Sequence, residues 1–498
     1  MDQSVHWYVG RRWLEGLTPY ATGMDTKPPG VFAIHALSVL VFGDHQYAVR
    51  VVDLAFVLLA GALIATFRAR TRDGARVVDV VPRRPGELGA ACLATSVLTY
   101  TFFDWSALGH SDLWQGVLVL AAGGVVVRAP DREVTWRRAF AAGAVAMAAV
   151  TLKHVAGVAF AFGLVVVALP LVRRRFREAA TLAGAYAGGA LLVLALTILP
   201  FAVTGALGPL REAMVDLIVR YVHVSAEHSA TPDSWPTWRH GLVPLLLGPA
   251  MALGGLAIAR FDRDRAARFE GALVLLAIAC GIACVLVQMR ARLSSFSYHW
   301  LAAIPALALG VAWGLRQMTP RHGVPQLVAV IALGAIAFSA APAWLPRPWH
   351  DYRTEWENRV AVWSGTLDPA RAEEAYHGHQ TMLDSHRWQA RVATWIRARA
   401  RPGDTLCVDG YFGAIHQETG LDCPGRLFIP PHALDGSPPA HFAEWERMFE
   451  RDPPTFFVTV SNRAETLARR RAQGYVAHDI MAGMRTRLVI LERRAASP

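Results

Sequence analysis

The sequence predicts a multi-span α-helical membrane protein with a small soluble α/β domain at its C-terminal end. Over 498 residues it is 53% hydrophobic, and its mean hydropathy is +0.29. That is too apolar for ordinary soluble domains. Apolar stretches recur up to about residue 345, and beyond them the composition becomes that of a soluble domain. We therefore divide the chain into an outer loop at 1–48, a transmembrane helical domain at 49–345 and a soluble extracytoplasmic domain at 346–498.

About ten apolar stretches approach the roughly 20 residues that cross a bilayer. They lie at 49–67, 87–104, 112–127, 139–152, 155–172, 179–202, 241–259, 269–289, 297–315 and 323–341. Arginines crowd alternate loops between them. By the positive-inside rule these loops face the cytoplasm, so residues 2–50, 203–240 and everything after about 345 lie outside. The net charge of +11 therefore reflects orientation in a membrane, and we expect no nucleic-acid partner.

Several outer segments have patterns of their own. Residues 4–17 mix aromatic and aliphatic residues with arginines, which predicts a helix in the membrane interface. Residues 28–42 are apolar but short for a span, and their prolines favour a helix start, so we expect a second interfacial helix. Lys153 and His154 interrupt a long apolar run, which predicts a tight outer turn. The polar and aromatic loop at 203–240 is a candidate lid over a substrate cavity.

Strands alternate with helices in the C-terminal region, which predicts a small α/β sheet domain. The predicted helices are Trp388–Arg399, Phe412–Thr419, His441–Glu450 and Ala464–Gln473, and the predicted strands are Thr405–Val408, Arg426–Ile429, Thr455–Val460 and Arg487–Leu491. No G-x-G-x-x-G turn follows the first strand, so nothing indicates a nucleotide site. Cys407 and Cys423 lie in this outer region, where a disulfide and a pair of buried thiols are both open.

The N-terminal fifty residues carry a motif in a fixed order: Asp2–Gln3, then Lys27–Pro28–Pro29, then Phe42–Gly43 and Arg50. This order resembles the first extracytoplasmic loop of the glycosyltransferases of the GT-C fold that use polyprenyl-phosphate sugars. That group includes the protein O-mannosyltransferases and the bacterial aminoarabinose transferases. Within it, the chain resembles glycosyltransferase family 39. The resemblance implies a GT-C fold. Members carry a transmembrane helix before this loop, so we expect a further span upstream of Met1.

The resemblance also implies roles for particular residues. Asp2 matches the family's catalytic aspartate, although the family often has Asp-Glu where this chain has Asp-Gln. Lys27 matches the lysine of the Lys-Pro-Pro motif, and its compact charge suits a donor phosphate. Asp112 matches a second acidic position, which would orient Lys27 or a bound metal. Tyr298 and His299 resemble an aromatic element at the outer end of a late helix, with His299 standing where many members have tyrosine.

Other basic residues are candidates because of their position. Arg290 and Arg292 lie outside, against the positive-inside pattern, so we expect them to bind the phosphate of a lipid substrate. The same role is open to Lys153 and His154. Arg50 either anchors its helix in the headgroups or touches phosphate.

Together these residues predict an inverting hexosyl- or pentosyltransferase of the cytoplasmic membrane. It would move a sugar from a polyprenyl-phosphate donor to an acceptor hydroxyl on the outer side, with a carboxylate as base and cations stabilising the leaving phosphate. The acceptor is open among protein, lipid and glycan, and membrane lipids are the other expected partners. We name no metal ligand and no required cofactor, and a divalent cation stays open. The alternatives are a transporter or flippase of a lipid-linked substrate, which favours charges near the midplane, and a noncatalytic membrane scaffold.

Overall fold

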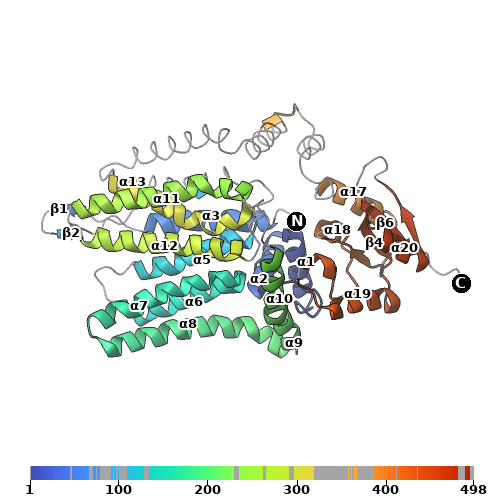
Figure 1. Cartoon of the computed structure of the whole chain (residues 1–498), viewed down its shortest axis with the longest axis horizontal. Coiled ribbons are helices and arrows are strands. Elements are labelled where there is room, and N and C mark those ends of the chain that lie inside the picture. The colour runs from blue at the N-terminus through green and yellow to red at the C-terminus, as the bar shows by residue number, and fades with distance from the viewer. Residues whose placement is uncertain are drawn as a thin grey trace.

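Long helices form a bundle at one end of the molecule, and a small sheet flanked by helices forms the other end (Figure 1). This computed structural model describes residues 2–44, 48–66, 71–73, 76–78, 109–127, 134–228, 235–261, 265–290, 297–318, 386–410, 412–434, 436–480 and 488–493, with a few single residues at 91–99 and 357–366.

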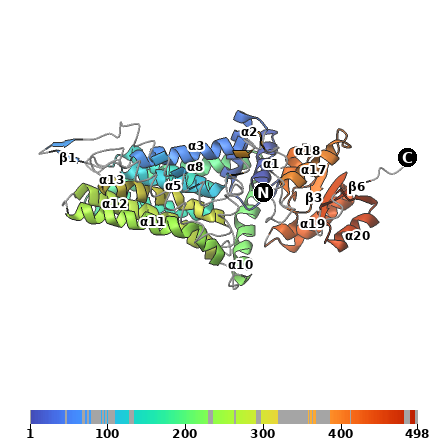
Figure 2. The same ribbon diagram turned by 90° about the horizontal axis from the view of Figure 1, so that it is seen from above.

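The bundle is built from apolar helices that run roughly side by side (Figures 1 and 2). They are α3 (Ala48–Thr66), α5 (Ser111–Val127), α6 (Trp136–Leu152), η2 with α7 (His154–Phe160 and Ala161–Val172), α8 (Phe176–Val203), α11 (Trp235–Phe261), α12 (Arg265–Arg290), and η6 with α13 (Ser297–Ala302 and Ile304–Met318). Trp114, Trp300 and Trp313 are buried at their centre. Because apolar side chains surround α5 on all sides, this helix is the core of the bundle.

Four of the described helical segments are long and apolar enough to cross a membrane: Ala48–Ala65, His154–Val172, Phe176–Val203 and Ala267–Gln288. The outward faces of these segments carry exposed leucines, such as Leu191, Leu192 and Leu196 on α8. Exposed apolar side chains in such a row suit lipid as the neighbouring solvent. The chain is an integral membrane protein. Most of the span expected at 87–104 and all of the span expected at 323–341 lie outside the described residues.

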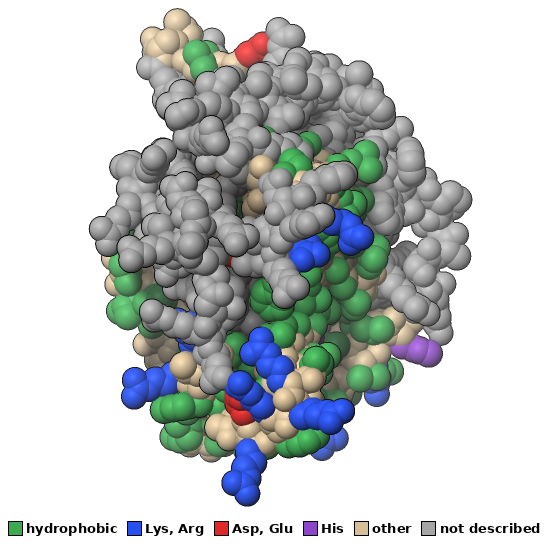
Figure 3. All heavy atoms as spheres, turned by 90° about the vertical axis from the view of Figure 1, so that its left-hand side faces the viewer, with side chains coloured by type: hydrophobic (Ala, Val, Ile, Leu, Met, Phe, Trp, Pro, Cys, Tyr) green, Lys and Arg blue, Asp and Glu red, His purple; other side chains and the backbone are tan. Residues whose placement is uncertain are grey.

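Exposed arginines gather at the end of the bundle that points away from the sheet. Arg173, Arg174 and Arg175 stand in the turn between α7 and α8, and they are exposed. The short hairpin of β1 (Thr71–Asp73) and β2 (Arg76–Val78) lies at this same end (Figure 1). Figure 3 looks onto it and shows basic side chains over apolar ones.

A layer of helices separates the bundle from the sheet, and we call it the connecting layer. It consists of α1 (Asp2–Leu14), α2 (Pro29–Phe42), α9 (Leu207–Arg211), the π-helix η3 (Glu212–Leu217) and α10 (Ile218–His228). In Figure 1, α1 and α10 run across the direction of the bundle helices. The segment expected as a lid loop at 203–240 is therefore largely helical, and residues 229–234 lie outside the described part.

Helix α1 buries its apolar side chains against protein. Val5, Trp7, Tyr8 and Val9 are all buried in one cluster with Cys407, Cys423 and Phe428 of the C-terminal region. The expectation that this segment lies in the membrane interface missed these protein contacts, because an amphipathic pattern does not say whether lipid or protein covers the apolar face. Helix α2, by contrast, exposes Leu37, Leu40 and Val41.

The C-terminal region is a four-stranded sheet in the order β3-β4-β6-β5. Strands β3 (Leu406–Val408) and β4 (Phe456–Val460) are parallel, whereas β6 (Leu488–Arg493) is antiparallel to both β4 and β5 (Tyr475–His478). Helices α17 (His386–Arg397), α18 (Gly413–Thr419), α19 (Pro439–Arg451) and α20 (Ala464–Ala472) flank it. The α/β class predicted for this region agrees with the structure.

Two strands differ from the sequence prediction. Residues 426–429 form no strand, and the backbone carbonyl of Arg426 instead accepts a hydrogen bond from Met24 in the loop between α1 and α2, at 2.7 Å. Pro424, Pro430 and Pro431 lie close on either side, and proline cannot donate to a ladder, so the segment pairs poorly with a strand. Strand β5, which the sequence analysis did not predict, follows the turn at Gly474.

Candidate functional site

Charged side chains from separate helices meet at the end of the bundle that faces the connecting layer. The Lys153 ammonium lies 2.7 Å and 2.8 Å from the two carboxylate oxygens of Asp112. His299 Nδ1 lies 3.4 Å from Asp112 Oδ1 and 3.3 Å from Lys153 Nζ. Asp112 and His299 are buried, and Lys153 is largely so. A buried carboxylate requires such partners, since an uncompensated charge away from water is costly.

Helix ends explain why these three residues meet. Asp112 stands in the first turn of α5, where the helix dipole favours a carboxylate, and Lys153 caps the C-terminal end of α6, where it favours a cation. The backbone of Lys153 is extended, with φ −162° and ψ 131°, and η2 begins directly after it. The break expected at Lys153 and His154 is therefore present. His299 enters from η6, ahead of α13.

Lys27 approaches the same place from the loop between α1 and α2. Its charge is close enough to act electrostatically on the His299 ring. The local backbone is held in a turn, because the Lys27 N–H donates to Asp25 Oδ1 at 3.4 Å and the Tyr20 hydroxyl donates to the Lys27 carbonyl at 2.7 Å. We call Lys27, Asp112, Lys153 and His299 the bundle-end cluster.

The contact of α2 with α6 sets the position of Lys27. Pro28 and Pro29 begin α2, so the helix starts two residues after Lys27. Gly30 then packs directly against Thr151, and a side chain at Gly30 would have no room there. Thr151 lies two residues before Lys153, so this contact brings both lysines to one end of the bundle.

The start of α1 lies beside the start of α5. Gln3 Cγ is within 3.6 Å of the position that a Cβ on Gly109 would occupy, and Gly109 precedes Asp112 by three residues. Gly109 has a φ of +77°, a conformation that glycine adopts without strain. Asp2 begins α1 directly before Gln3, but its side chain lies outside the described part of the chain.

Arg50 stands close to the same turn. Its Nη1 lies 3.7 Å from the position of a Cβ on Gly109, and its charge acts on Asp53 one turn further along α3. Asp53 is buried and accepts a hydrogen bond from the Trp114 ring nitrogen at 3.0 Å. Arg50 therefore faces protein groups near the bundle-end cluster.

The structure does not place the remaining expected site residues. Arg290 ends α12 and Tyr298 lies in η6, but the side chains of both fall outside the described part. Arg292 lies outside the described residues altogether. The roles expected for these three residues stay predictions.

Two further residues of the N-terminal segment, Asp25 and His6, were not singled out from the sequence. Asp25 is 4% exposed, and its Oδ2 lies 3.6 Å from Nε2 of His6 in α1. His6 in turn packs against His35 with ring centroids 5.5 Å apart. The available signal was the pattern Asp25-Thr-Lys27, in which an aspartate two residues before the lysine forms an Asx turn.

Lysines and an imidazole beside one carboxylate are suited to an anionic ligand. Asp112 neutralises Lys153, whereas the charge of Lys27 comes to the cluster from another element. Lysine is a compact cation that binds phosphate oxygens. Within the described residues no group of three or more His, Cys, Asp or Glu side chains has the geometry of a metal site.

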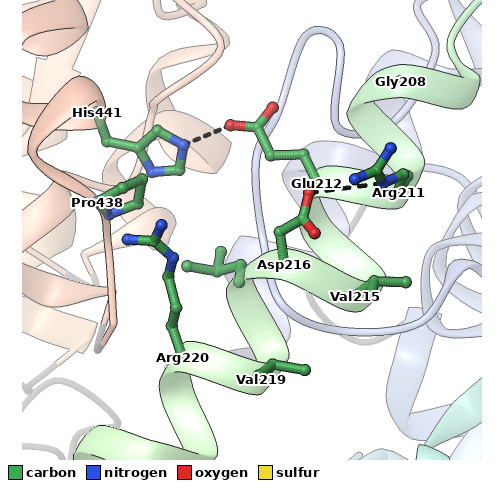
Figure 4. Close-up of a pocket in the computed structure, with 10 residues that line it drawn as sticks. Gly208, Arg211, Glu212, Val215, Asp216, Val219, Arg220, Pro438 and His441 are labelled. Carbon is green, nitrogen blue, oxygen red and sulfur yellow. Dashed lines mark hydrogen bonds and ion pairs between the residues drawn. The ribbon is translucent and has the colours of Figure 1, made fainter.

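A cavity lies between the connecting layer and the C-terminal region, away from the bundle-end cluster. It is a cleft of about 700 Å³ between η3, α10 and α19, lined among others by Arg211, Arg220 and His441 (Figure 4). Glu212 Oε1 lies 2.6 Å from His441 Nε2 at its wall. Burial raises the pKa of Glu212, but hydrogen bonds from Arg426 and His441 outweigh it, so the net pKa lies below its usual value. The cleft shares no lining residue with the bundle-end cluster.

No protein-family model matches the sequence, and no curated protein matches it. A solved structure does match: ArnT from Cupriavidus metallidurans, bound to undecaprenyl phosphate. The TM-score is 0.58 at 16% sequence identity, and the match covers 100% of this chain and 95% of that one. An identity this low shows the fold. The expected GT-C fold is thereby confirmed over the whole chain, the C-terminal region included.

Proposed function

We propose that the protein is an inverting glycosyltransferase that uses a polyprenyl-phosphate sugar on the outer side of the cytoplasmic membrane. Asp2 acts as the base on an acceptor hydroxyl, and the hydroxyl oxygen then attacks the anomeric carbon. Lys27, with Arg290 and Arg292, stabilises the polyprenyl phosphate as it leaves. Stabilisation of charge that develops in the transition state is usually the largest catalytic contribution. Asp112, Tyr298, His299 and Arg50 support this site.

The observation that carries the proposal is the meeting of Asp112, Lys153 and His299 at one end of the bundle, to which the contact of Gly30 with Thr151 also brings the loop of Lys27. These residues are far apart in the sequence, and the resemblance to the GT-C glycosyltransferases names three of them: Lys27, Asp112 and His299. The start of α1, which carries Asp2, lies against the turn that leads to Asp112. An acid and cations at one place match the requirements of sugar transfer from a lipid phosphate.

The fold and the charge distribution support the donor class and the orientation. ArnT, the solved structure of the same fold, is bound to undecaprenyl phosphate. The exposed arginines lie at the end of the bundle opposite to the bundle-end cluster. By the positive-inside rule that end faces the cytoplasm, so the cluster, the connecting layer and the C-terminal region face outward.

Substitution of Asp2 and Lys27 tests the catalytic assignment. The assay follows the release of undecaprenyl phosphate from undecaprenyl-phosphate sugars by the full-length protein in liposomes. We expect Asp2→Asn to lower turnover by about 100-fold or more, the size of a lost general base. Lys27→Met should lower turnover and also weaken the binding of undecaprenyl phosphate itself. Asp44→Asn is the matched control, because Asp44 is an exposed acid in the same segment.

Normal turnover of correctly inserted Asp2→Asn and Lys27→Met proteins would contradict the proposal. Binding of undecaprenyl phosphate with no turnover in the unaltered protein, together with its movement between leaflets, would favour a flippase instead.

A double-mutant cycle on Asp112 and Lys153 separates support of the fold from support of the reaction. Removal of one partner leaves a buried charge unpaired, so Asp112→Asn and Lys153→Met should each destabilise the protein by about 3–5 kcal/mol. The double variant removes both charges and should recover much of that loss. We expect turnover to stay low in the stable double variant, because Lys27 then remains without the Asp112 carboxylate and the Lys153 ammonium that stand beside it in the bundle-end cluster. Recovery of full turnover would show that the pair only holds the helices together.

A further inference from the structure

Two buried cysteines of the C-terminal region face each other across a short distance. Cys407 stands in the middle of β3, and Cys423 follows α18 in the loop at 420–425. Their sulfur atoms are 2.9 Å apart, and both side chains are buried. The backbone also runs together here, because the Leu406 N–H donates to the Asp422 carbonyl at 2.9 Å. We propose that Cys407 and Cys423 form a disulfide that fastens the loop at 420–425 to the sheet.

The geometry favours a bond over two separate thiols. The two sulfurs are closer than an ordinary non-bonded pair, and closure to the bonded distance of about 2.0 Å needs only a small side-chain adjustment. The bond would close a loop whose ends are 16 residues apart. Met448 Sδ lies 3.9 Å from each sulfur, so an apolar sulfur environment surrounds the pair.

The loop that the disulfide would fasten is the loop that holds α1. Arg11 Nη2 donates to Asp422 Oδ1 at 2.7 Å, and the Cys423 N–H donates to the Tyr8 hydroxyl at 2.9 Å. Arg12 Nη1 donates to that same hydroxyl at 2.7 Å. Helix α1 carries Asp2 at its start. The disulfide would therefore fix, through this loop, the helix that begins at the proposed catalytic residue.

Oxidation of the two thiols to a disulfide requires an oxidant from outside the chain. The thiolate of one cysteine attacks the disulfide of an extracytoplasmic thiol–disulfide oxidoreductase and forms a mixed disulfide, and the second cysteine then displaces the oxidoreductase as a dithiol. The oxidoreductase accepts two electrons and two protons. Burial raises the pKa of the Cys407 thiol, which disfavours the thiolate in the folded chain. The exchange therefore belongs to folding, before β3 is covered.

This inference rests on the outward placement of the C-terminal region in the proposed function, since disulfides persist in oxidising compartments. The test starts from full-length protein in membranes whose free thiols are blocked with N-ethylmaleimide under denaturing conditions, without reduction. Digestion and mass spectrometry should find the peptides of Cys407 and Cys423 joined, at a mass two hydrogens below their sum. Cys280 and Cys284, buried in the spanning helix α12, are the internal control and should carry the label.

Label on both Cys407 and Cys423 would overturn the disulfide. A separate chain with alkaline phosphatase fused after Pro498 reports the orientation, because the enzyme folds actively only outside the cytoplasm. An inactive fusion would overturn the outward placement in the proposed function, while the peptide masses would still decide the disulfide. A wrong disulfide and a wrong orientation therefore give different results.

Alanine variants test the consequence for stability. A disulfide is lost as a unit, so Cys407→Ala, Cys423→Ala and the double variant should lower the melting temperature by the same amount, at least about 2–4 °C. Two separate thiols would give losses that add up in the double variant, and that result would contradict the proposal.

Discussion

A buried histidine, His416, lies at the contact between α1 and the C-terminal region. His416 is 1% exposed, and its ring lies 4.8 Å from the Tyr8 ring of α1. Its Nδ1 donates to the Leu421 carbonyl at 2.9 Å, whereas Nε2 has no partner among the described residues. Burial lowers the pKa of His416 to about 4, so the ring is neutral at neutral pH.

This neutral histidine should make the stability of the protein depend on pH. The unfolded chain takes up the proton near pH 6.5, but the folded chain resists it until about pH 4. The contribution of His416 is therefore fully present above about pH 6.5 and is lost as the pH falls towards 4. We expect a loss of about 1–3 kcal/mol over that range. In the His416→Asn variant, an amide replaces the ring near the Nδ1 position. The melting temperature of this variant should depend less on pH between 6.5 and 4.

His223→Asn provides the control, because His223 is exposed on α10. Its substitution should leave the pH dependence unchanged. A His416→Asn protein that loses stability between pH 6.5 and 4 as steeply as the unaltered protein would show that other groups control this range.

Part of the candidate site was expected from the sequence. Lys27, Asp112 and His299 could be named because the chain resembles the GT-C glycosyltransferases at these positions. The partnership of Asp112 with Lys153 could not be read from the sequence, because 41 residues separate them and only the antiparallel packing of α5 and α6 joins them. The burial of Asp25 could not be read from the sequence either, because its partner His6 comes from α1.

At the scale of elements, α6 and α8 pack so closely that glycine is required. A Cβ on Gly143 of α6 would overlap the backbone carbonyl of Tyr186, and a Cβ on Gly189 of α8 would overlap that of Phe140. Small residues at such crossings let the backbones of membrane helices approach. We expect Gly143→Ala to force the helices apart and to destabilise the protein by about 1–3 kcal/mol. The melting temperature of the full-length protein in detergent measures the effect.

Gly184 is the matched control on α8. A Cβ there meets nothing within 4 Å, and the residue is exposed. Gly184→Ala should therefore be neutral or stabilise the helix by about 0.5–1 kcal/mol. Equal losses in the two variants would mean that helix propensity or lipid contact, and not the crossing of α6 and α8, sets the result.

The elements show where sequence patterns are informative. The helices of the bundle follow from hydropathy, and α5, α6 and α8 begin and end within a few residues of the predicted stretches. The strand β5 escaped prediction because one buried residue is followed by three half-buried ones, so its residues show no alternation of apolar and polar side chains. The segment 426–429 has the composition of a strand, but its backbone pairs with Met24 of the N-terminal loop, and composition cannot reveal that partner.

The whole molecule is held together by contacts that no local pattern indicates. The apolar face of α1 predicts a buried surface, but the pattern does not say whether a membrane or another domain covers it. In the structure, α18 and the loop after it cover this face. In the connecting layer Ala213 and Leu217 likewise pack in the same apolar cluster as Trp445 of α19. Such pairings depend on the folded topology, so the placement of the C-terminal region relative to the bundle lay beyond sequence reasoning.

Arg426 joins three parts of the molecule and should be the most sensitive point of this assembly. Its guanidinium donates to Glu212 of η3 at 2.7 Å and to Glu444 of α19 at 2.7 Å, while its carbonyl accepts from Met24. We expect Arg426→Gln to cost about 1–3 kcal/mol, because hydrogen bonds to charged groups are lost and carboxylates are left without their cation. Hydrogen exchange should rise in 207–217 and in 439–451 together, since one side chain fastens both.

Arg469→Gln is the control that separates this role from an ordinary ion pair. Arg469 also contacts two carboxylates, Glu446 at 3.0 Å and Glu465 at 3.1 Å, but both belong to the C-terminal region and its side chain is 48% exposed. Exposed pairs of this kind contribute at most about 1 kcal/mol. The control should therefore leave exchange in 207–217 unchanged. A rise confined to 439–451 in the Arg426→Gln protein would mean that η3 stays in place through its apolar contacts, and that the ion pairs at Arg426 do not couple the membrane helices to the sheet.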